Sequence, residues 1–102
     1  MLELRPNCEF CDCDLPADST AARICTYECT FCAGCVEKIL ENVCPNCGGG
    51  FAARPIRPST EYRPGLGLGH QPASGKRINT KYSHEEISAF SNRIKHIAAA
   101  QR

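Results

Sequence analysis

The sequence has no apolar run long enough to form a signal-peptide core or a membrane span. We therefore expect a cytoplasmic protein with no membrane partner. Thiols in the cytosol stay reduced, so dense cysteine in such a chain indicates metal or redox chemistry rather than disulfides. All nine cysteines precede residue 48, and residues 48–102 contain none.

The sequence also lacks the usual signatures of a catalytic site. It has no nucleophile motif, no paired carboxylates at a catalytic spacing and no phosphate-binding glycine loop, because the glycines at residues 65–69 belong to a Gly/Pro-rich stretch. We therefore expect no enzymatic activity. The three histidines lie beyond the cysteines and are explained as solvent-exposed side chains; they are His70, His84 and His96.

Large apolar side chains are scarce in residues 1–50, which we call the head. So small a set cannot by itself offset the conformational entropy that the chain loses on folding. A structural zinc site supplies about 10–16 kcal/mol of apparent binding energy, and only when its ligands are gathered. We therefore predict that the head folds only with metal bound.

Eight of the nine cysteines form four closely spaced pairs. Three pairs have the Cys-x-x-Cys spacing of a zinc knuckle, in which two thiolates bind one tetrahedral ion, and one pair has three intervening residues. Four pairs supply the ligands of two four-thiolate sites. We expect two Zn²⁺ ions and favour them over iron, which four thiolates also bind. The pairs are Cys8 with Cys11, Cys25 with Cys29, Cys32 with Cys35, and Cys44 with Cys47.

The order and spacing of these pairs resemble the RING finger, with Cys29 at the position that histidine usually holds. The resemblance implies a RING-like, treble-clef zinc finger in which the ligand pairs alternate between two ions. A sequential arrangement, with the first four ligands on one ion and the last four on the other, remains open. In the alternating arrangement zinc 1 is bound by Cys8, Cys11, Cys32 and Cys35, and zinc 2 by Cys25, Cys29, Cys44 and Cys47.

The head, with the Cys-Pro-Asn-Cys-Gly-Gly sequence at its end and the Arg-Pro-Ile-Arg-Pro sequence that follows, also resembles a small bacterial family catalogued only as a domain of unknown function. A bacterial origin would leave a ubiquitin ligase without its usual partners. Gly48 also stands where ligase RING fingers often have a basic residue, although Pro45 matches them. We therefore do not expect ubiquitin-ligase activity.

Cys13 is left over from the four pairs and follows a predicted ligand by two residues. The simpler interpretation is an ordinary small side chain on the loop between ligands. The alternative is a redox-sensitive thiol or a substitute ligand for the metal.

Residue types predict a small β-hairpin and one helix in the head. Ile, Thr and Phe occur in residues 22–26 and 28–31, with Tyr27 between these two runs, which are predicted as strands carrying Cys25 and Cys29. Apolar residues recur at helical spacing in residues 33–42, and a proline soon afterwards prevents the helix from continuing. We therefore expect a small metal-stabilised α+β domain over residues 1–50.

The two halves of the chain carry opposite charge. The head has three Lys or Arg against eight Asp or Glu, a formal net charge of −5, whereas residues 51–102, the tail, have nine against three, a net charge of +6. Proline and glycine dominate residues 51–82, which we predict to be an extended linker, flexible between Pro64 and Gly75. The basic tail can attract nucleic acid, an acidic partner or the protein's own head.

A C-terminal amphipathic helix is predicted over residues 83–101. Ser83 and Glu86 have the spacing of a capping box, in which each side chain accepts a hydrogen bond from the backbone amide of the other residue. An apolar stripe follows, and it needs a surface to cover it. This stripe supplies the candidate partner-binding residues Ile87, Phe90, Ile94 and Ile97.

The predicted sites favour a binding function. A four-thiolate zinc ion has no open coordination position, so both sites are expected to be structural. The favoured function is a zinc-binding interaction module that docks a protein partner, or a second copy of itself through the C-terminal helix. Nucleic-acid binding through the basic tail is one alternative, although few aromatic residues there can stack on bases. A thiol redox or metal-handling role is the other.

Overall fold

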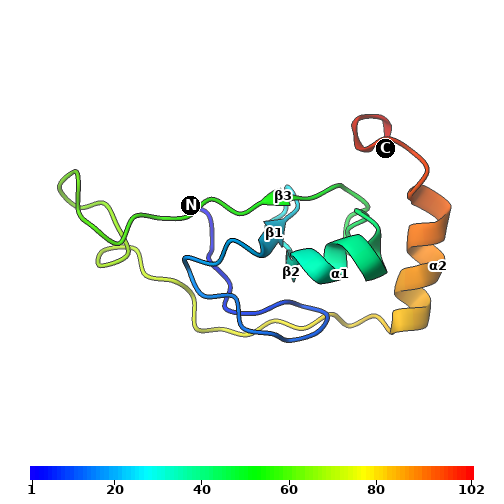
Figure 1. Ribbon diagram of the computed structural model, residues 1–102, viewed down its shortest axis with the longest axis horizontal. Coiled ribbons are helices and arrows are strands. Elements are labelled where there is room, and N and C mark those ends of the chain that lie inside the picture. Colours follow the sequence, from blue (N-terminus) through cyan, green and yellow to red (C-terminus); the bar gives the residue numbers. More distant parts are fainter.

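The computed structural model describes all 102 residues and contains one small antiparallel sheet. Strand β1 (Ala22–Ile24) lies between β2 (Thr30–Cys32) and β3 (Ala52–Ala53), as Figure 1 shows. Arg23, in the middle of β1, lies opposite Phe31 of β2. Because β3 belongs to this sheet, the folded unit of the head continues past the boundary that we predicted at residue 50.

The turn between β1 and β2 carries two of the cysteines. The N–H of Cys25 donates to the carbonyl of Cys29 at 3.3 Å, and the N–H of Glu28 donates to the carbonyl of Cys25 at 3.0 Å. Glu28 adopts a left-handed φ of 67°, which reverses the chain within a few residues. The predicted strands were therefore too long, and both cysteines lie in the turn.

The predicted helix of the head is present but short. Helix α1 (Ala33–Cys35) continues directly into a π-helical turn, η1 (Val36–Leu40). It ends where Glu41 and Asn42 adopt left-handed φ values of 49° and 60°. The backbone therefore leaves the helix before Pro45 is reached.

Cysteine makes up much of the core. The buried apolar cluster has eleven members, of which five are cysteines. Phe31 is completely buried at its centre, and its ring meets that of Phe51 edge to face with 5.5 Å between centroids. The structure confirms the small α+β class, and the thin apolar core agrees with the scarcity of large apolar residues.

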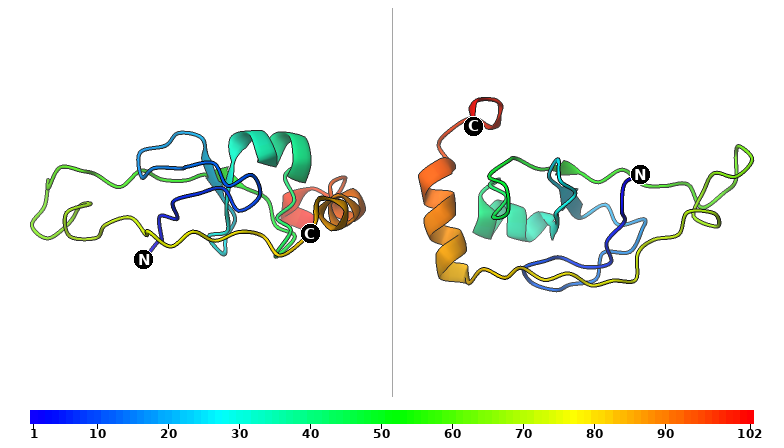
Figure 2. Two further views of the ribbon diagram at one scale, coloured as in Figure 1. Left: turned by 90° about the horizontal axis from the view of Figure 1, so that it is seen from below. Right: turned by 180° about the vertical axis from the view of Figure 1, so that it is seen from behind.

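Residues 54–82 leave the sheet, form a loop at the end of the molecule opposite α2 and return alongside the N-terminal segment (Figures 1 and 2). We call this loop the far loop. On the way out, Arg57 donates to the carbonyl of Leu2 at 2.7 Å. On the way back, the N–H of Ser74 donates to the carbonyl of Leu4 at 3.0 Å. The segment predicted as a flexible linker is extended, and these bonds attach it to the head.

Helix α2 (His84–Ile94) begins with the predicted capping box. The N–H of Glu86 donates to Ser83 Oγ at 3.1 Å, and the N–H of Ser83 donates to Glu86 Oε1 at 3.0 Å. The helix is shorter than the predicted span of residues 83–101, because it ends at Ile94. A short 3-10 turn, η2 (Ala99–Gln101), follows.

Helix α2 packs on the helix of the head. Ser91 Oγ donates to the carbonyl of Leu40 at 2.9 Å, and Ile87 joins the buried core. Beyond the helix the chain turns back, and Arg102 Nη1 donates to the carbonyl of Asn42 at 2.7 Å. The residues after Ile94 therefore return to the head instead of continuing the helix.

Removal of the capping hydroxyl should loosen α2. We expect Ser83→Ala to destabilise the docked helix by about 1 kcal/mol, because the Glu86 amide loses its acceptor. Hydrogen exchange of the α2 amides measures this local effect. The control is Ser88→Ala, the same chemical change at a half-buried position within the helix that takes no part in the cap. Equal exchange rates in the two variants would contradict the role of the cap.

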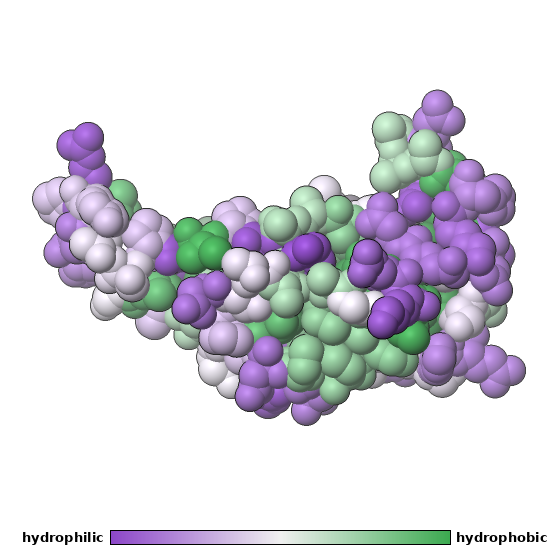
Figure 3. All heavy atoms as spheres, in the orientation of Figure 1, coloured by the Kyte–Doolittle hydropathy of each residue, from purple (hydrophilic) through white to green (hydrophobic).

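Hydrophilic residues cover α2 and the far loop in the view of Figure 3, and hydrophobic residues gather between them, over the sheet and α1. None of the helices is long and apolar enough to cross a membrane.

Candidate metal centres

The first cysteine cluster, which we call cluster 1, joins three parts of the chain. Cys8 and Cys11 come from the N-terminal loop, Cys32 is the last residue of β2 and Cys35 is the last residue of α1. Their four Sγ atoms all lie within 4.8 Å of one another. Cys8 and Cys35 are buried and Cys11 is exposed, so the cluster faces solvent on the Cys11 side.

The spacing of these sulfur atoms fits a tetrahedral metal ion. A Zn–S distance of about 2.3 Å places the sulfur ligands of a tetrahedron about 3.8 Å apart. The Sγ atoms of Cys11 and Cys32 are 3.8 Å apart. Four soft thiolates with no oxygen or nitrogen ligand are a donor set that zinc favours, so cluster 1 fits a structural zinc ion.

The second cluster, cluster 2, contains Cys25, Cys44 and Cys47, whose Sγ atoms also lie within 4.8 Å of one another. The fourth predicted ligand, Cys29, lies outside that distance. Cys29 nevertheless lines one pocket together with Asn46 and the cluster residue Cys47. The structure therefore gathers three of these four predicted ligands and places the fourth beside them.

Backbone amides point at three of the clustered sulfur atoms. Each donor lies two or three residues after the cysteine that accepts its hydrogen bond, because the chain curls around the sulfur. Hydrogen bonds of this kind favour the thiolate over the thiol, which is the form that binds metal. The N–H of Cys35 donates to Cys32 Sγ at 3.4 Å, the N–H of Tyr27 donates to Cys25 Sγ at 3.3 Å, and the N–H of Gly49 donates to Cys47 Sγ at 3.4 Å.

Burial and hydrogen bonding shift the pKa values of some of the clustered thiols, among them Cys8, Cys11 and Cys44. Burial is the largest influence on Cys8 and Cys44, and it raises the pKa of both thiols. At Cys11 burial also acts to raise the pKa, but hydrogen bonds with Cys13, Cys8 and Cys32 outweigh it and lower the pKa to about 7. A metal ion must therefore displace protons from the buried thiols when it binds.

We expect the metal affinity of cluster 1 to fall as the pH falls. Above about pH 7 the Cys11 thiol has already lost its proton. Below about pH 7 a metal ion must also displace the Cys11 proton when it binds. The dependence of log Kd on pH should therefore steepen on acidification. Competition with a chelator of known affinity between about pH 6 and pH 8 measures the slope. A constant slope across this range would contradict the expectation.

A buried carboxylate lies between the two clusters. Glu9, which follows Cys8, is 3% exposed. Its Oε2 accepts from the N–H of Thr30 at 2.8 Å and from Arg5 Nη1 at 3.1 Å, and its Oε1 accepts from Asn46 Nδ2 at 3.3 Å. Asn46 lies within the last Cys-x-x-Cys pair, so Glu9 ties the loops of both clusters together. Sequence analysis missed this residue, because an acidic residue between two cysteines is not distinctive.

Two further buried side chains hold the N-terminal cysteine loop. Arg54 donates to the carbonyls of Arg5 at 2.8 Å and Pro16 at 2.9 Å, and burial lowers the pKa of its guanidinium. Asn7 is fully buried, donates to the carbonyl of Ile78 at 2.9 Å and accepts from the N–H of Ile78 at 3.2 Å. Arg54 and Ile78 belong to the predicted linker, so this segment supports cluster 1.

The apolar stripe of α2 is used largely within the chain. Ile87 is 1% exposed and belongs to the core, so a partner cannot reach it. Phe90 and Ile94 are half-buried, and both lie 3.7 Å from the position that a Cβ on Gly48 would occupy. Ile97 remains accessible, at 37% exposed. The stripe therefore covers the end of the last Cys-x-x-Cys loop of the same chain.

The fold and the two clusters together define a small cysteine-rich α+β domain suited to binding metal. The family model described as "Protein of unknown function (DUF1272)" matches residues 1–57, and the chain belongs to this family. It is also 56% identical over 78 residues to an uncharacterized protein of Rhizobium meliloti (strain 1021), with 76% of this chain and 86% of that protein covered. This similarity includes residues beyond the family match. No solved structure matches.

Proposed function

We propose that the protein is a non-catalytic interaction module stabilised by two zinc ions, with ligand pairs that alternate between the ions as in the RING finger. The distances between the Sγ atoms support this proposal, because the first and third pairs meet in cluster 1, and Cys25 of the second pair meets the fourth pair in cluster 2. Four thiolates leave no coordination position open for water or substrate. The metal then serves folding, and the protein surface carries the function.

Native mass spectra of the full chain, purified without added metal or chelator, test the metal count and its identity. Two zinc ions per chain are expected. One ion per chain, or iron in place of zinc, would overturn the proposed two-zinc module.

Cadmium-113 substitution tests which cysteines share an ion. Each cadmium couples to the β protons of its own ligands, so one cadmium should correlate with Cys8 and Cys35 and the other with Cys29 and Cys44. The Cys29 correlation is the most informative, because its Sγ lies outside the 4.8 Å group of cluster 2. A correlation of Cys8 and Cys29 with the same cadmium would establish the sequential arrangement instead.

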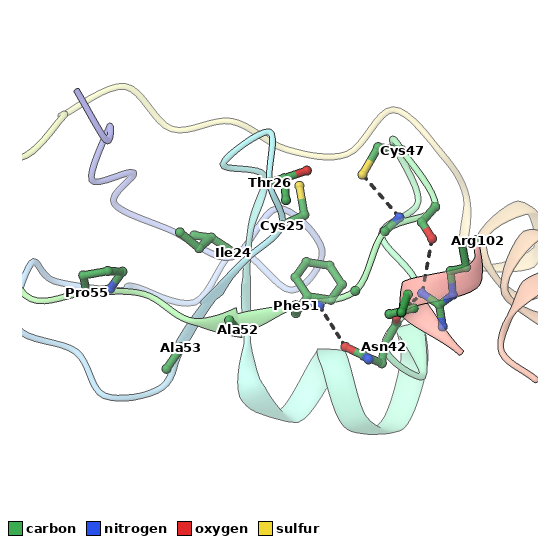
Figure 4. A pocket seen from close by; sticks show the side chains of 15 residues that line it. Ile24, Cys25, Thr26, Asn42, Cys47, Phe51, Ala52, Ala53, Pro55 and Arg102 are labelled. Atoms are coloured by element: carbon green, nitrogen blue, oxygen red, sulfur yellow. Dashed lines mark hydrogen bonds between the residues drawn. The ribbon is translucent and has the colours of Figure 1, made fainter. Parts of the chain in front are cut away.

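The docking surface that we propose is a groove beside the edge strand β3. Ile24, Ala53 and Pro55 lie at one end of the groove and Arg102 at the other, with Phe51 between them (Figure 4). Most of its lining is apolar or glycine. The groove therefore combines an apolar floor with an exposed strand.

The backbone of β3 has hydrogen-bonding groups that face this groove. The N–H of Arg54 donates to the carbonyl of Ala22, and the preceding residue Ala53 lies opposite Arg23. In an antiparallel ladder the pairs alternate, so the N–H and C=O of Ala53 point away from β1. An extended apolar segment of a protein partner can add to this edge as a further strand.

Selection from a library of extended peptides tests this surface on the zinc-loaded chain. We expect apolar sequences whose binding slows hydrogen exchange of the Ala53 amide. Selected peptides that instead protect α2 or the far loop would overturn the assignment of the groove.

The ion pairs between tail and head support protein docking over nucleic-acid binding. Arg77 lies 3.2 Å from Asp12 and 2.8 Å from Asp14, and Lys95 lies 3.1 Å from Glu41. These cations are already paired with the acidic head, whereas each phosphate contact needs an available cation. Tight duplex binding with a steep salt dependence would contradict this preference.

A further inference from the structure

Asn42 occupies part of the backbone edge to which a partner strand would add. Outward-facing backbone groups recur at every second residue along an extended edge, so Phe51 presents its N–H on the same side as Ala53. That N–H donates to Asn42 Oδ1 at 2.9 Å, which Figure 4 shows as a dashed line. The side-chain oxygen of Asn42 therefore takes the place that a carbonyl of an added strand would fill.

The other end of this edge offers no replacement donor. Pro55 is two residues after Ala53 and lacks a backbone N–H, because its nitrogen belongs to the pyrrolidine ring. A strand that pairs with Ala53 therefore reaches a second N–H donor at Phe51. The bond between Phe51 and Asn42 thus determines how much of the edge is available to a partner.

The backbone of Asn42 is fixed, whereas its side chain can turn away. The N–H of Asn42 donates to the carbonyl of Val36 at 3.1 Å, and the φ of Asn42 is left-handed, at 60°. Left-handed backbone is uncommon in residues with a side chain, although Asn tolerates it better than most and glycine adopts it freely. Rotation of the Asn42 side chain would free the Phe51 N–H without moving η1.

The C-terminal turn, η2 with Arg102, covers the same end of the groove. Arg102 Nη1 donates to the carbonyls of Asn42 at 2.7 Å and Gly48 at 3.2 Å. Ala99 lines the groove, and its Cβ lies 3.1 Å from the position that a Cβ on Gly50 would occupy. The turn therefore lies beside the residues that lead into β3, where an added strand would continue.

This C-terminal segment is held by polar contacts at solvent-exposed positions. Every residue from 95 to 102 is exposed. Lys95 Nζ donates to Glu41 Oε2 at 3.1 Å before the turn, and Arg102 makes its hydrogen bonds after it. Exposed contacts of this kind contribute little to stability, and the buried Ser91 would still hold α2 on the head. The segment can therefore leave the groove while the fold stays intact.

We propose that Asn42 and the C-terminal turn form an autoinhibitory latch, which closes the Phe51 end of the β3 groove until a partner strand displaces it. The inference rests on the proposed docking surface beside β3. With the latch closed a partner pairs with Ala53, and with the latch open the added strand also pairs with Phe51. The partner class that fits is an extended apolar segment long enough to span both residues. Its apparent affinity is reduced in proportion to the fraction of chains in which the latch is open.

Two variants of the zinc-loaded full chain release the latch in different ways. Arg102→Ala removes the bonds to Asn42 and Gly48, whereas Asn42→Gly removes the acceptor of the Phe51 N–H and suits the left-handed φ. The probe is the tightest-binding peptide from library selections on the wild type and on Asn42→Gly. We expect it to bind both variants about five- to tenfold more tightly than the wild type, and to slow hydrogen exchange of the Phe51 amide as well as that of Ala53.

Gln101→Ala is the matched control, because Gln101 belongs to the same turn but does not line the groove. It should bind the probe as the wild type does. Equal or weaker binding to Arg102→Ala and Asn42→Gly, by a peptide that still protects Ala53, would leave the docking surface standing and overturn the latch alone. Selections that yield no peptide protecting Ala53 on either chain would overturn the docking surface itself, and the latch with it.

Discussion

Chelation of the metal should unfold the head of this protein. Five of the eleven core residues are cysteines, and four of these five belong to the two thiol clusters. A structural zinc ion contributes about 10–16 kcal/mol of apparent folding energy, whereas a typical domain is stable by about 5–15 kcal/mol in total. The chemical-shift dispersion of the amide resonances in NMR spectra of the chelated chain measures the effect. We expect this dispersion to be lost.

The effect of chelation should extend to α2. This helix has eleven residues and depends on its contact with the head, because helices of this length are marginal alone in water. Added zinc should restore the dispersed spectrum, and chelator saturated with zinc beforehand serves as the control. A well-dispersed spectrum from a fully chelated sample would show that the apolar core suffices.

Truncation of the buried carboxylate should have the next largest effect. Glu9→Ala leaves Arg5 without its close ion-pair partner and leaves the amides of Thr30 and Asn46 without an acceptor. Removing one member of a buried, hydrogen-bonded pair costs about 3–5 kcal/mol. Denaturant unfolding of the zinc-loaded chain measures the loss. We also expect weaker metal binding, because Glu9 joins the loops of both clusters.

Glu3→Ala is the matched control for this variant. Glu3 Oε2 lies 3.9 Å from Arg5 Nε and its side chain is 44% exposed, so this pair is long and solvated. Removal of such a surface pair costs about 0–1 kcal/mol. Equal losses in Glu3→Ala and Glu9→Ala would mean that the buried hydrogen bonds of Glu9 contribute little.

Local patterns in the sequence predicted the features that depend on neighbouring residues. The capping box at Ser83 and Glu86 is present because both of its bonds form within four residues. The short cysteine spacings anticipated that the thiols would gather, and seven of the eight paired cysteines lie in the two clusters. Cys29 differs because it lies in the tight turn between β1 and β2, and its Sγ stays outside the 4.8 Å group of cluster 2.

Features that depend on distant residues were not predictable in this way. Asn7 and Ile78 are 71 residues apart in sequence, and their reciprocal hydrogen bonds leave no periodic pattern in either segment. Arg54 likewise lies in a proline-rich stretch, and only the folded chain shows that the carbonyls of Arg5 and Pro16 surround it. The sequence therefore did not reveal how the predicted linker attaches to the head, because these attachments are made by single buried polar groups.

The way in which the tail returns to the head bears on how the chain tolerates a break. Residues on both sides of the far loop are hydrogen-bonded to the head, through Arg57 before it and Ser74 after it. Tyr62 and Leu66, within the loop, are 79% and 57% exposed. Exposed loops of this kind accept nicks and insertions when the flanking segments are held independently. A cut in this loop should yield two fragments that stay together, and the same position should accommodate an inserted tag or domain.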